Sequence, residues 1–146
     1  MLGLKDVPVV NIDEEDKKAY KELGESEEIF RNADAKDIFI IAVGLGVHKG
    51  LRKPIQKKHS GGFFRGSYLR EEDEALLAAV AVYATSVDVL CNEREVVEIA
   101  EEYAHGGVQE LLRWVQSSPF ECFEKDFERE IVELIEEFLK DDATNT

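Results

Sequence analysis

One stretch decides the fold class of this chain: residues 34–47, which read DAKDIFIIAVGLGV. Its apolar part would also suit a buried strand, since periodicity cannot separate strand from helix in so short a run. We favour a helix because Asp34 can cap it and the acids of its first turn lie at the positive end of the helix dipole. Ala42 and Gly46 lie four residues apart, a spacing that lets a second helix approach closely. The stretch therefore predicts a closely packed helix.

The chain after residue 70 has the spacing of further helices. Four acids at 71–74 open a helix that we expect to lie centrally among the others. Asn92 and Glu95 resemble a capping box, and the helix they open is predicted to end at Gly106-Gly107. A short helix over 108–116 follows. The apolar face predicted for the helix that starts at residue 71 consists of Leu76, Val80, Tyr83, Val87 and Leu90.

The last helix has a strong start signal at Ser118-Pro119-Phe120-Glu121 and is predicted to fray after Lys140. It carries an apolar stripe that suits either core packing or a groove of a partner such as a second copy. That stripe consists of Phe123, Phe127, Ile131, Leu134 and Phe138.

The 146 residues predict two regions, an N-terminal arm over 1–28 and a single helical domain over 29–146. The arm is partly extended around Val7-Pro8-Val9-Val10, with a short helix near 14–23 that stops at Gly24. The fold class is mainly α: a small bundle of about five helices with a long basic, glycine-rich loop that has room for one short strand or hairpin.

Charge and hydropathy exclude several classes of protein. The formal net charge of −14 argues against indiscriminate binding to nucleic acid or anionic membrane. The longest apolar run, residues 38–47, is about half the length of a membrane span, and the first eleven residues lack the apolar core of a secretory signal. Two cysteines, Cys91 and Cys122, give neither a disulfide framework nor zinc-ligand spacing. We expect a soluble, cytoplasmic protein.

The segment 48–70, hereafter the basic loop, differs sharply from the rest of the chain. It holds seven basic residues and no acid, so eleven basic and 32 acidic residues remain elsewhere, a charge of −21. Two interpretations stay open: binding of nucleic acid or another polyanion, or pairing of the cations with acidic helices of the same molecule or of a protein partner. The candidate binding residues are Lys49, Arg52, Lys53, Lys57, Lys58, Arg65 and Arg70, with Phe63 and Phe64 as aromatic groups on which bases could stack.

No catalytic or metal-binding pattern is complete. Glu102 and His105 have the Glu-x-x-His spacing of di-iron bundles, but such sites need two copies and the chain has one. His105 is expected at a helix end, satisfied by Glu101 across one turn. Ser60 beside His59 lacks a nucleophile-elbow pattern. We therefore expect no catalytic residue, no metal and no other cofactor.

Three segments together resemble a known family. They are Asp37-Ile38-Phe39 with Ala42 and Gly46, the step Arg52-Lys53-Pro54, and the signature Glu101-Glu102-Tyr103-Ala104-His105-Gly106-Gly107. The pattern is similar to the DNA phosphorothioation-associated protein 4 family over roughly residues 30–115. His105 departs from the asparagine usual in that family. The matching motif positions are Asp37, Phe39, Gly46, Glu102, Tyr103, Gly106 and Gly107.

The resemblance implies residence with systems that place sulfur in the DNA backbone and restrict DNA that lacks it, and it carries over no catalytic residue. We expect a non-catalytic accessory protein of DNA modification or defence that contacts DNA or a DNA-bound protein through the basic loop. The alternative is an acidic helical adaptor or homodimer without nucleic-acid contact. An enzyme is the third interpretation, which a bound metal or nucleotide turnover would favour.

Overall fold

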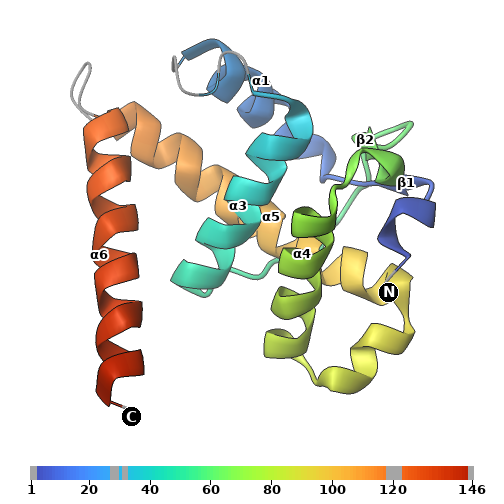
Figure 1. Ribbon diagram of the computed structural model, residues 1–146. Coiled ribbons are helices and arrows are strands. Elements are labelled where there is room, and N and C mark those ends of the chain that lie inside the picture. The colour runs from blue at the N-terminus through green and yellow to red at the C-terminus, as the bar shows by residue number, and fades with distance from the viewer. Residues whose placement is uncertain (1–2, 27–29, 31–32, 118–122, 145–146) are drawn as a thin grey trace. The chain divides into compact units, whose positions relative to one another are not determined.

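The computed structural model describes residues 3–26, 30, 33–117 and 123–144, and it is mainly helical (Figure 1). The chain divides into two compact units, residues 1–113 and 114–146, and each is described by itself. The prediction of a mainly α fold is confirmed, because the described residues form five α-helices and one two-stranded sheet. The helices are α1 (Lys17–Ser26), α3 (Ala35–Lys49), α4 (Glu71–Ala84), α5 (Glu93–Ser117) and α6 (Phe123–Thr144).

The N-terminal segment is built into the first unit. Strand β1 (Val9–Val10) pairs antiparallel with β2 (Phe64–Arg65), so the basic loop contains the short strand for which its sequence left room. Leu4 and Val10 are fully buried. The division into an arm over 1–28 and a domain over 29–146 stays a prediction. Helix α1 continues to Ser26, so the predicted stop at Gly24 was wrong.

Helix α3 confirms the choice of helix over strand for residues 34–47. Asp34 occupies the N-cap position, where its backbone carbonyl accepts the N–H groups of Asp37 and Ile38, although its side chain makes no capping hydrogen bond. The helix ends at Gly50, whose φ of 67° lies in the left-handed region that glycine adopts without steric cost.

Helices α3 and α5 cross at very short range because glycines line their contact (Figure 1). A Cβ placed on Gly46 would lie 2.2 Å from the carbonyl oxygen of Tyr103, and one on Gly107 would lie 1.8 Å from that of Ala42. The prediction that Ala42 and Gly46 admit a neighbouring helix is thus confirmed. The predicted helix end at Gly106-Gly107 was wrong: α5 is continuous over 25 residues, and these glycines permit close packing and not a turn.

Helix α4 differs from its prediction in length and in burial. It ends at Ala84, and a 3₁₀ helix over Val87–Cys91 follows. Tyr83 is 73% exposed and Val87 is 67% exposed, so the predicted central position was wrong. Of the small residues on α4, Ala75 and Ala79 face solvent, whereas Ala81 is fully buried. The start of α5 does follow the prediction, because the Asn92 side chain accepts the Glu95 N–H at 3.2 Å.

The second unit consists of the end of α5 and α6, in which the rings of Trp114 and Phe127 lie 5.7 Å apart. Helix α6 extends to Thr144, so the predicted fraying after Lys140 was wrong. The start signal at 118–121 and the side chains of Phe123 and Phe138 lie outside the described residues. Across the ranges that the structure describes, no helix is both long enough and apolar enough to span a membrane.

Candidate functional site

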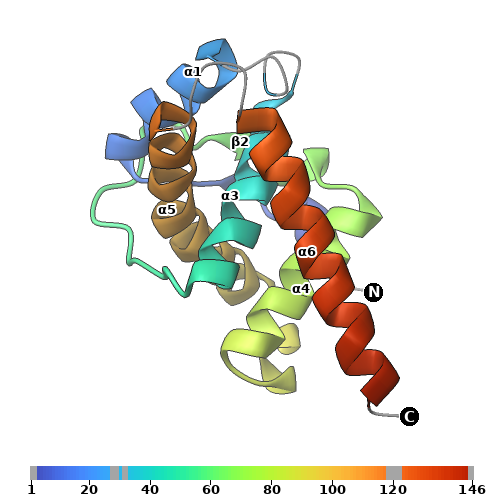
Figure 2. The same cartoon turned by 90° about the vertical axis from the view of Figure 1, so that its left-hand side faces the viewer.

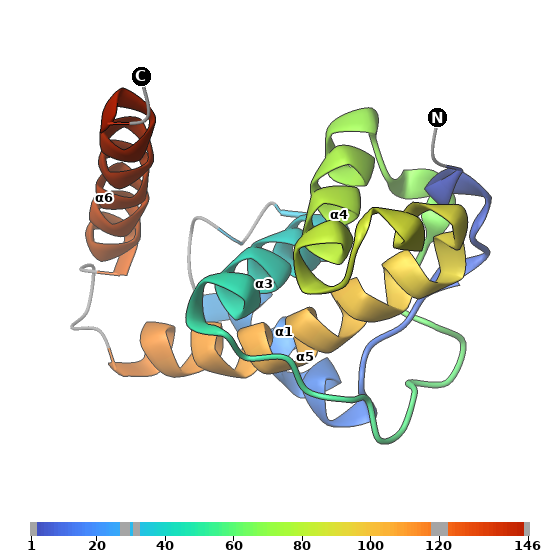
Figure 3. The ribbon, with the colours of Figure 1, turned by 90° about the horizontal axis from the view of Figure 1, so that it is seen from below.

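The basic loop is held to the rest of the first unit through its backbone. From the end of α3 it passes along α5 and then reaches the N-terminal segment (Figures 2 and 3). Five backbone–backbone hydrogen bonds outside the β1–β2 pairing fasten it, so the loop presents its side chains from a fixed path although it contains little regular structure. These bonds are Leu51 N–H to Gly46, Lys53 N–H to Glu102, His59 N–H to Ile12, Phe63 N–H to Val10, and Glu14 N–H to the carbonyl of Lys57.

Glycines at the tip of the loop make a tight turn. Gly61 and Gly62 have φ values of 82° and 77°, which other residues rarely adopt. The Gly62 N–H donates to the carbonyl of His59 at 3.1 Å, so this group serves the turn. A Cβ on Gly62 would also lie 2.8 Å from Cβ of Val9. The glycine pair therefore shapes the loop against β1.

Three of the seven predicted cations are paired within the molecule. Arg52 contacts Glu102 at 2.8 Å and lies over the ring of Tyr103. Lys57 contacts Glu14 at 2.9 Å, and Arg70 lies 3.6 Å from its neighbour on α4, Asp73. For these three residues the internal electrostatic interpretation holds.

The other four cations face solvent without an ion pair to any residue that the structure describes. They are Lys49, Lys53, Lys58 and Arg65, and all four are exposed. Lys58 lies near enough to the buried Glu101 to lower the pKa of that carboxyl. These four residues carry the positive charge of the basic loop that forms no ion pair with a described residue.

The two phenylalanines of the loop point into the protein. Phe64 is 7% exposed, and its ring meets that of Phe39 edge-on at 5.3 Å. Phe63 is half-buried, with its ring 4.5 Å from that of Tyr20. The predicted base-stacking role is therefore wrong for Phe64, because a buried ring has no free face. Phe63 and Phe64 thus anchor the basic loop to the rest of the first unit.

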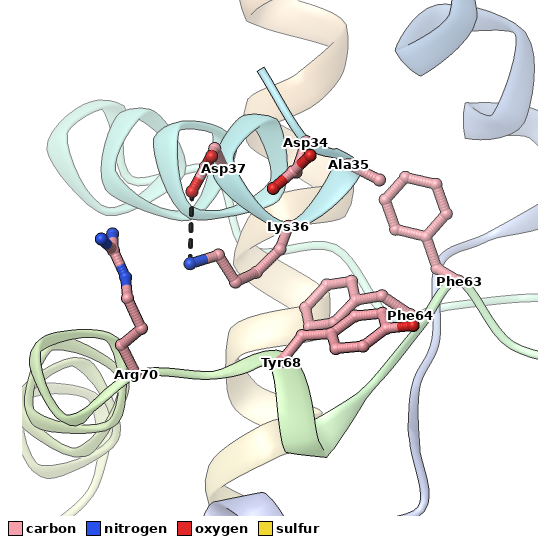
Figure 4. A pocket seen from close by; sticks show the side chains of 8 residues that line it. All are labelled: Asp34, Ala35, Lys36, Asp37, Phe63, Phe64, Tyr68 and Arg70. Atoms are coloured by element: carbon pink, nitrogen blue, oxygen red, sulfur yellow. Dashed lines mark ion pairs between the residues drawn. The ribbon is translucent and has the colours of Figure 1, made fainter. Parts of the chain in front are cut away.

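A hollow of about 620 Å³ lies between the N-terminal end of α3 and the end of the basic loop (Figure 4). The lining includes one buried lysine, Lys36. Its Nζ lies 2.7 Å from the carboxylate of Asp73 and 3.3 Å from that of Asp37, and these two groups neutralise its charge. Burial lowers the pKa of Lys36, but these two carboxylates outweigh it and raise the pKa above its usual value. Tyr68 and Arg70, two exposed residues of the basic loop, also line this hollow.

The buried Glu101 has a different partner from the one predicted. Its carboxylate accepts the backbone N–H of Asn11 at 2.5 Å and does not pair with His105. Burial raises the pKa of Glu101 to about 7, and the Asn11 N–H, Arg94 and Lys58 only partly oppose this effect, while Glu98 adds to it. The carboxyl thus changes its charge near neutral pH.

Glu101→Gln is expected to remove a pH dependence of stability. Glu101 binds its proton more tightly in the folded state than in the unfolded state, where its pKa is 4.5, so the wild type loses stability as the pH rises from about 4.5 to 7. The loss amounts to about 3 kcal/mol. Urea unfolding at pH 5 and pH 8 should show a much smaller fall for Glu101→Gln than for the wild type. Glu95→Gln, an exposed control six residues earlier on α5, should keep the wild-type fall; equal falls in all three proteins would contradict the assignment.

His105 lies in the middle of α5 and faces the N-terminal segment. Its Nδ1 is 2.6 Å from Oδ2 of Asp16, whose other oxygen accepts Nε2–H of Gln109 at 2.7 Å. Burial raises the pKa of Asp16 despite these two partners. On the other side of the ring, Nε2 lies 3.6 Å from Asp13 and 3.4 Å from Glu15. We name Asp13, Glu15, Asp16 and His105 the carboxylate–histidine cluster.

Asp13 joins this cluster to the basic loop. Its side chain accepts the N–H groups of Glu15 at 3.1 Å, Gln56 at 2.8 Å and Lys57 at 3.4 Å. Burial raises the pKa of Asp13, but these backbone donors outweigh it and hold the pKa below its usual value. The sequence did not indicate this cluster, because its acids lie about ninety residues from His105 in an ordinary charged segment. Only the Glu-x-x-His pattern pointed to His105, and its Glu102 binds Arg52 instead.

Three of the family-motif positions, Gly46, Tyr103 and Gly107, form the contact between α3 and α5. Phe39 and Gly46 lie on α3, and Tyr103, Gly106 and Gly107 lie on α5 at the close approach. A Cβ on Gly106 would lie 1.8 Å from the carbonyl oxygen of Leu51, so this glycine also admits the first residue of the loop after α3. Glu102 and Asp37 hold Arg52 and Lys36 by ion pairs.

Fold and site together define an acidic helical protein with one basic, backbone-anchored loop. The sequence matches the family described as DNA sulphur modification system-associated protein 4 over residues 10–140, most of the chain. The chain therefore belongs to that family, as the resemblance of its motifs predicted, and the family is associated with a DNA sulphur modification system. No curated protein and no solved structure matches the chain.

Proposed function

We propose that this protein is a non-catalytic accessory protein that contacts DNA, or a protein bound to DNA, through the basic loop. The observation that carries this proposal is the set of four exposed cations, Lys49, Lys53, Lys58 and Arg65, on a loop whose backbone is fastened to α5 and the N-terminal segment. Membership of a family associated with DNA sulphur modification supports a role beside DNA.

Charge distribution favours a local contact and not a wide interface. The basic loop stands against a charge of −21 on the remaining residues, so DNA would meet repulsion everywhere except at the loop. Four phosphate contacts would give a salt slope of about −3.6, and affinity would fall about a hundredfold between about 50 and 200 mM salt. The loop would supply positioning on the backbone and little base readout, since Phe64 is buried.

The loop variant Lys49→Gln, Lys53→Gln, Lys58→Gln and Arg65→Gln is expected to lose this binding. The measurement is fluorescence anisotropy of a labelled duplex at about 50 and 200 mM salt. A matched control changes four exposed lysines elsewhere, Lys5, Lys17, Lys21 and Lys125, to glutamine and alters the net charge equally. Loss in the loop variant with retention in the control supports the proposal. Absence of binding at micromolar protein, or equal loss in both variants, counts against direct DNA contact through the loop.

The alternative is a protein–protein adaptor in which the basic loop docks on an acidic face, including that of a second copy. The internal pairs of Arg52 with Glu102 and Lys57 with Glu14 favour it, because they show that this loop already accommodates carboxylates. Analytical ultracentrifugation at the same two salt concentrations separates the two functions. Self-association that salt and the loop variant both abolish would favour the adaptor.

A further inference from the structure

The Nε2 atom of His105 faces two carboxylates without a hydrogen bond of ordinary length. The other ring nitrogen, Nδ1, lies 2.6 Å from the Asp16 carboxylate, a contact that favours the neutral tautomer with its proton on Nδ1 and its lone pair on Nε2. That lone pair points toward oxygens of Asp13 at 3.6 Å and Glu15 at 3.4 Å, beyond the usual 2.7–3.2 Å of an N–H···O bond. Both His105 and Asp13 have side chains that are only 5% exposed.

A cation between these ligand atoms would remove the repulsion among them. A lone pair directed at two carboxylates in a buried site is repulsive, and a proton on Nε2 would draw one oxygen to hydrogen-bond distance. The observed spacing suits a larger ion. We infer that Asp13, Glu15 and His105 bind a divalent first-row transition metal ion.

The geometry and the ligand types agree with this inference. The three ligand atoms all lie within 4.8 Å of one another. Ligands at about 2.0–2.2 Å from a metal ion stand about 3.0–3.6 Å from each other, and rotation of the exposed Glu15 side chain can close the remaining gap. The imidazole among the ligands favours zinc over calcium, while the two carboxylates also suit manganese. Asp16, itself held by Gln109, orients the imidazole as carboxylates do behind metal-bound histidines.

A metal ion here would join three parts of the first unit. His105 belongs to α5, Asp13 and Glu15 belong to the N-terminal segment, and Asp13 also holds the backbone of the basic loop at Gln56 and Lys57. The Asp13 oxygen that faces His105 is Oδ2, which accepts the Gln56 N–H at 2.8 Å with one lone pair; its other lone pair, which meets the Lys57 N–H only at 3.4 Å, would take the ion. The site would therefore fix the loop in place. The inference does not depend on DNA binding, and its test contains no DNA.

The test is isothermal titration of the chelator-treated full chain with Zn²⁺, Mn²⁺ and Ca²⁺. We expect one Zn²⁺ or Mn²⁺ to bind per chain. At a free metal concentration of 100 times Kd, the equilibrium constant for unfolding should be about a hundredfold lower than without metal. Glu15→Gln, at an exposed position that does not endanger folding, should weaken binding at least about tenfold, as should His105→Gln. Glu14→Gln is the control, because its carboxylate lies next in sequence but binds Lys57.

Two results would overturn the inference. One is Glu15→Gln binding Zn²⁺ and Mn²⁺ as tightly as Glu14→Gln and the wild type. The other is Ca²⁺ binding as tightly as Zn²⁺, which would mean that a chain of charge −14 attracts any divalent ion without using the imidazole. Zn²⁺ binding by the wild type and Glu14→Gln, together with a loss in Glu15→Gln, would establish the site.

Discussion

Gly107→Ala is expected to destabilise the protein by about 3 kcal/mol or more. The added methyl would lie 1.8 Å from the carbonyl oxygen of Ala42 and 2.8 Å from the backbone nitrogen of Gly46. Both obstacles are backbone atoms of α3, so no side-chain rotation can relieve the clash and the two helices must separate. Separation would open the contact that buries Ala42, Val43 and Ala104. Chemical denaturation, read by circular dichroism, measures the loss.

Gly44→Ala is the matched control on α3. No atom lies within 4 Å of a Cβ placed on Gly44, and the residue is exposed. Alanine at this position should stabilise the helix by about 0.5–1 kcal/mol, because glycine is a poor helix former. The two substitutions add the same methyl group and should move the unfolding midpoint in opposite directions. A Gly107→Ala protein as stable as the wild type would disprove the close helix contact.

Local sequence patterns predicted most of the helices, but not all of their ends and few of the contacts between them. The cap at Asp34 and the small residues Ala42 and Gly46 predicted α3 and its close neighbour correctly. Glycines such as Gly106 and Gly107 are typical of a helix end. Here they lie inside α5, where the absence of a side chain lets α3 and the residue Leu51 pack closely against them. A glycine pair inside a helical pattern is therefore ambiguous until its neighbour is known.

The candidate site shows the same limit. Its excess of positive charge was visible in the sequence, because 48–70 lacks acids. The sequence did not show which cations pair internally, because the partners of Lys57 and Arg52 come from distant parts of the chain. These partners are Glu14 and Glu102. The carboxylate–histidine cluster was missed for the same reason: β1 pairing with β2 and the loop anchored on α5 bring residues 13–16 to His105.

Asp73→Asn is expected to cost about 3 kcal/mol, because it removes the charge that neutralises a buried lysine. Lys36 and Asp73 have side chains only 8% and 7% exposed, and Nζ lies 2.7 Å from Oδ2. Burial raises the pKa of Asp73, yet Lys36 and the Arg70 N–H outweigh it and hold the pKa below its usual value. The asparagine side chain keeps an oxygen that can accept the Arg70 N–H and so preserve the cap of α4. The loss of stability therefore measures the effect of removing the charge. Urea unfolding at pH 7 measures it.

Lys36→Met supplies the decisive background for this prediction. In that variant no buried ammonium remains, so adding Asp73→Asn should cost about 1 kcal/mol or less. Asp37→Asn is the control on the same lysine: its carboxylate lies 3.3 Å from Nζ but is 41% exposed, and its removal should cost about 1 kcal/mol or less. Equal effects of Asp73→Asn in the presence and absence of Lys36 would mean that Asp73 acts through the helix cap alone. A large coupling would instead identify the pair as the charged link by which α4 is fastened to the start of α3.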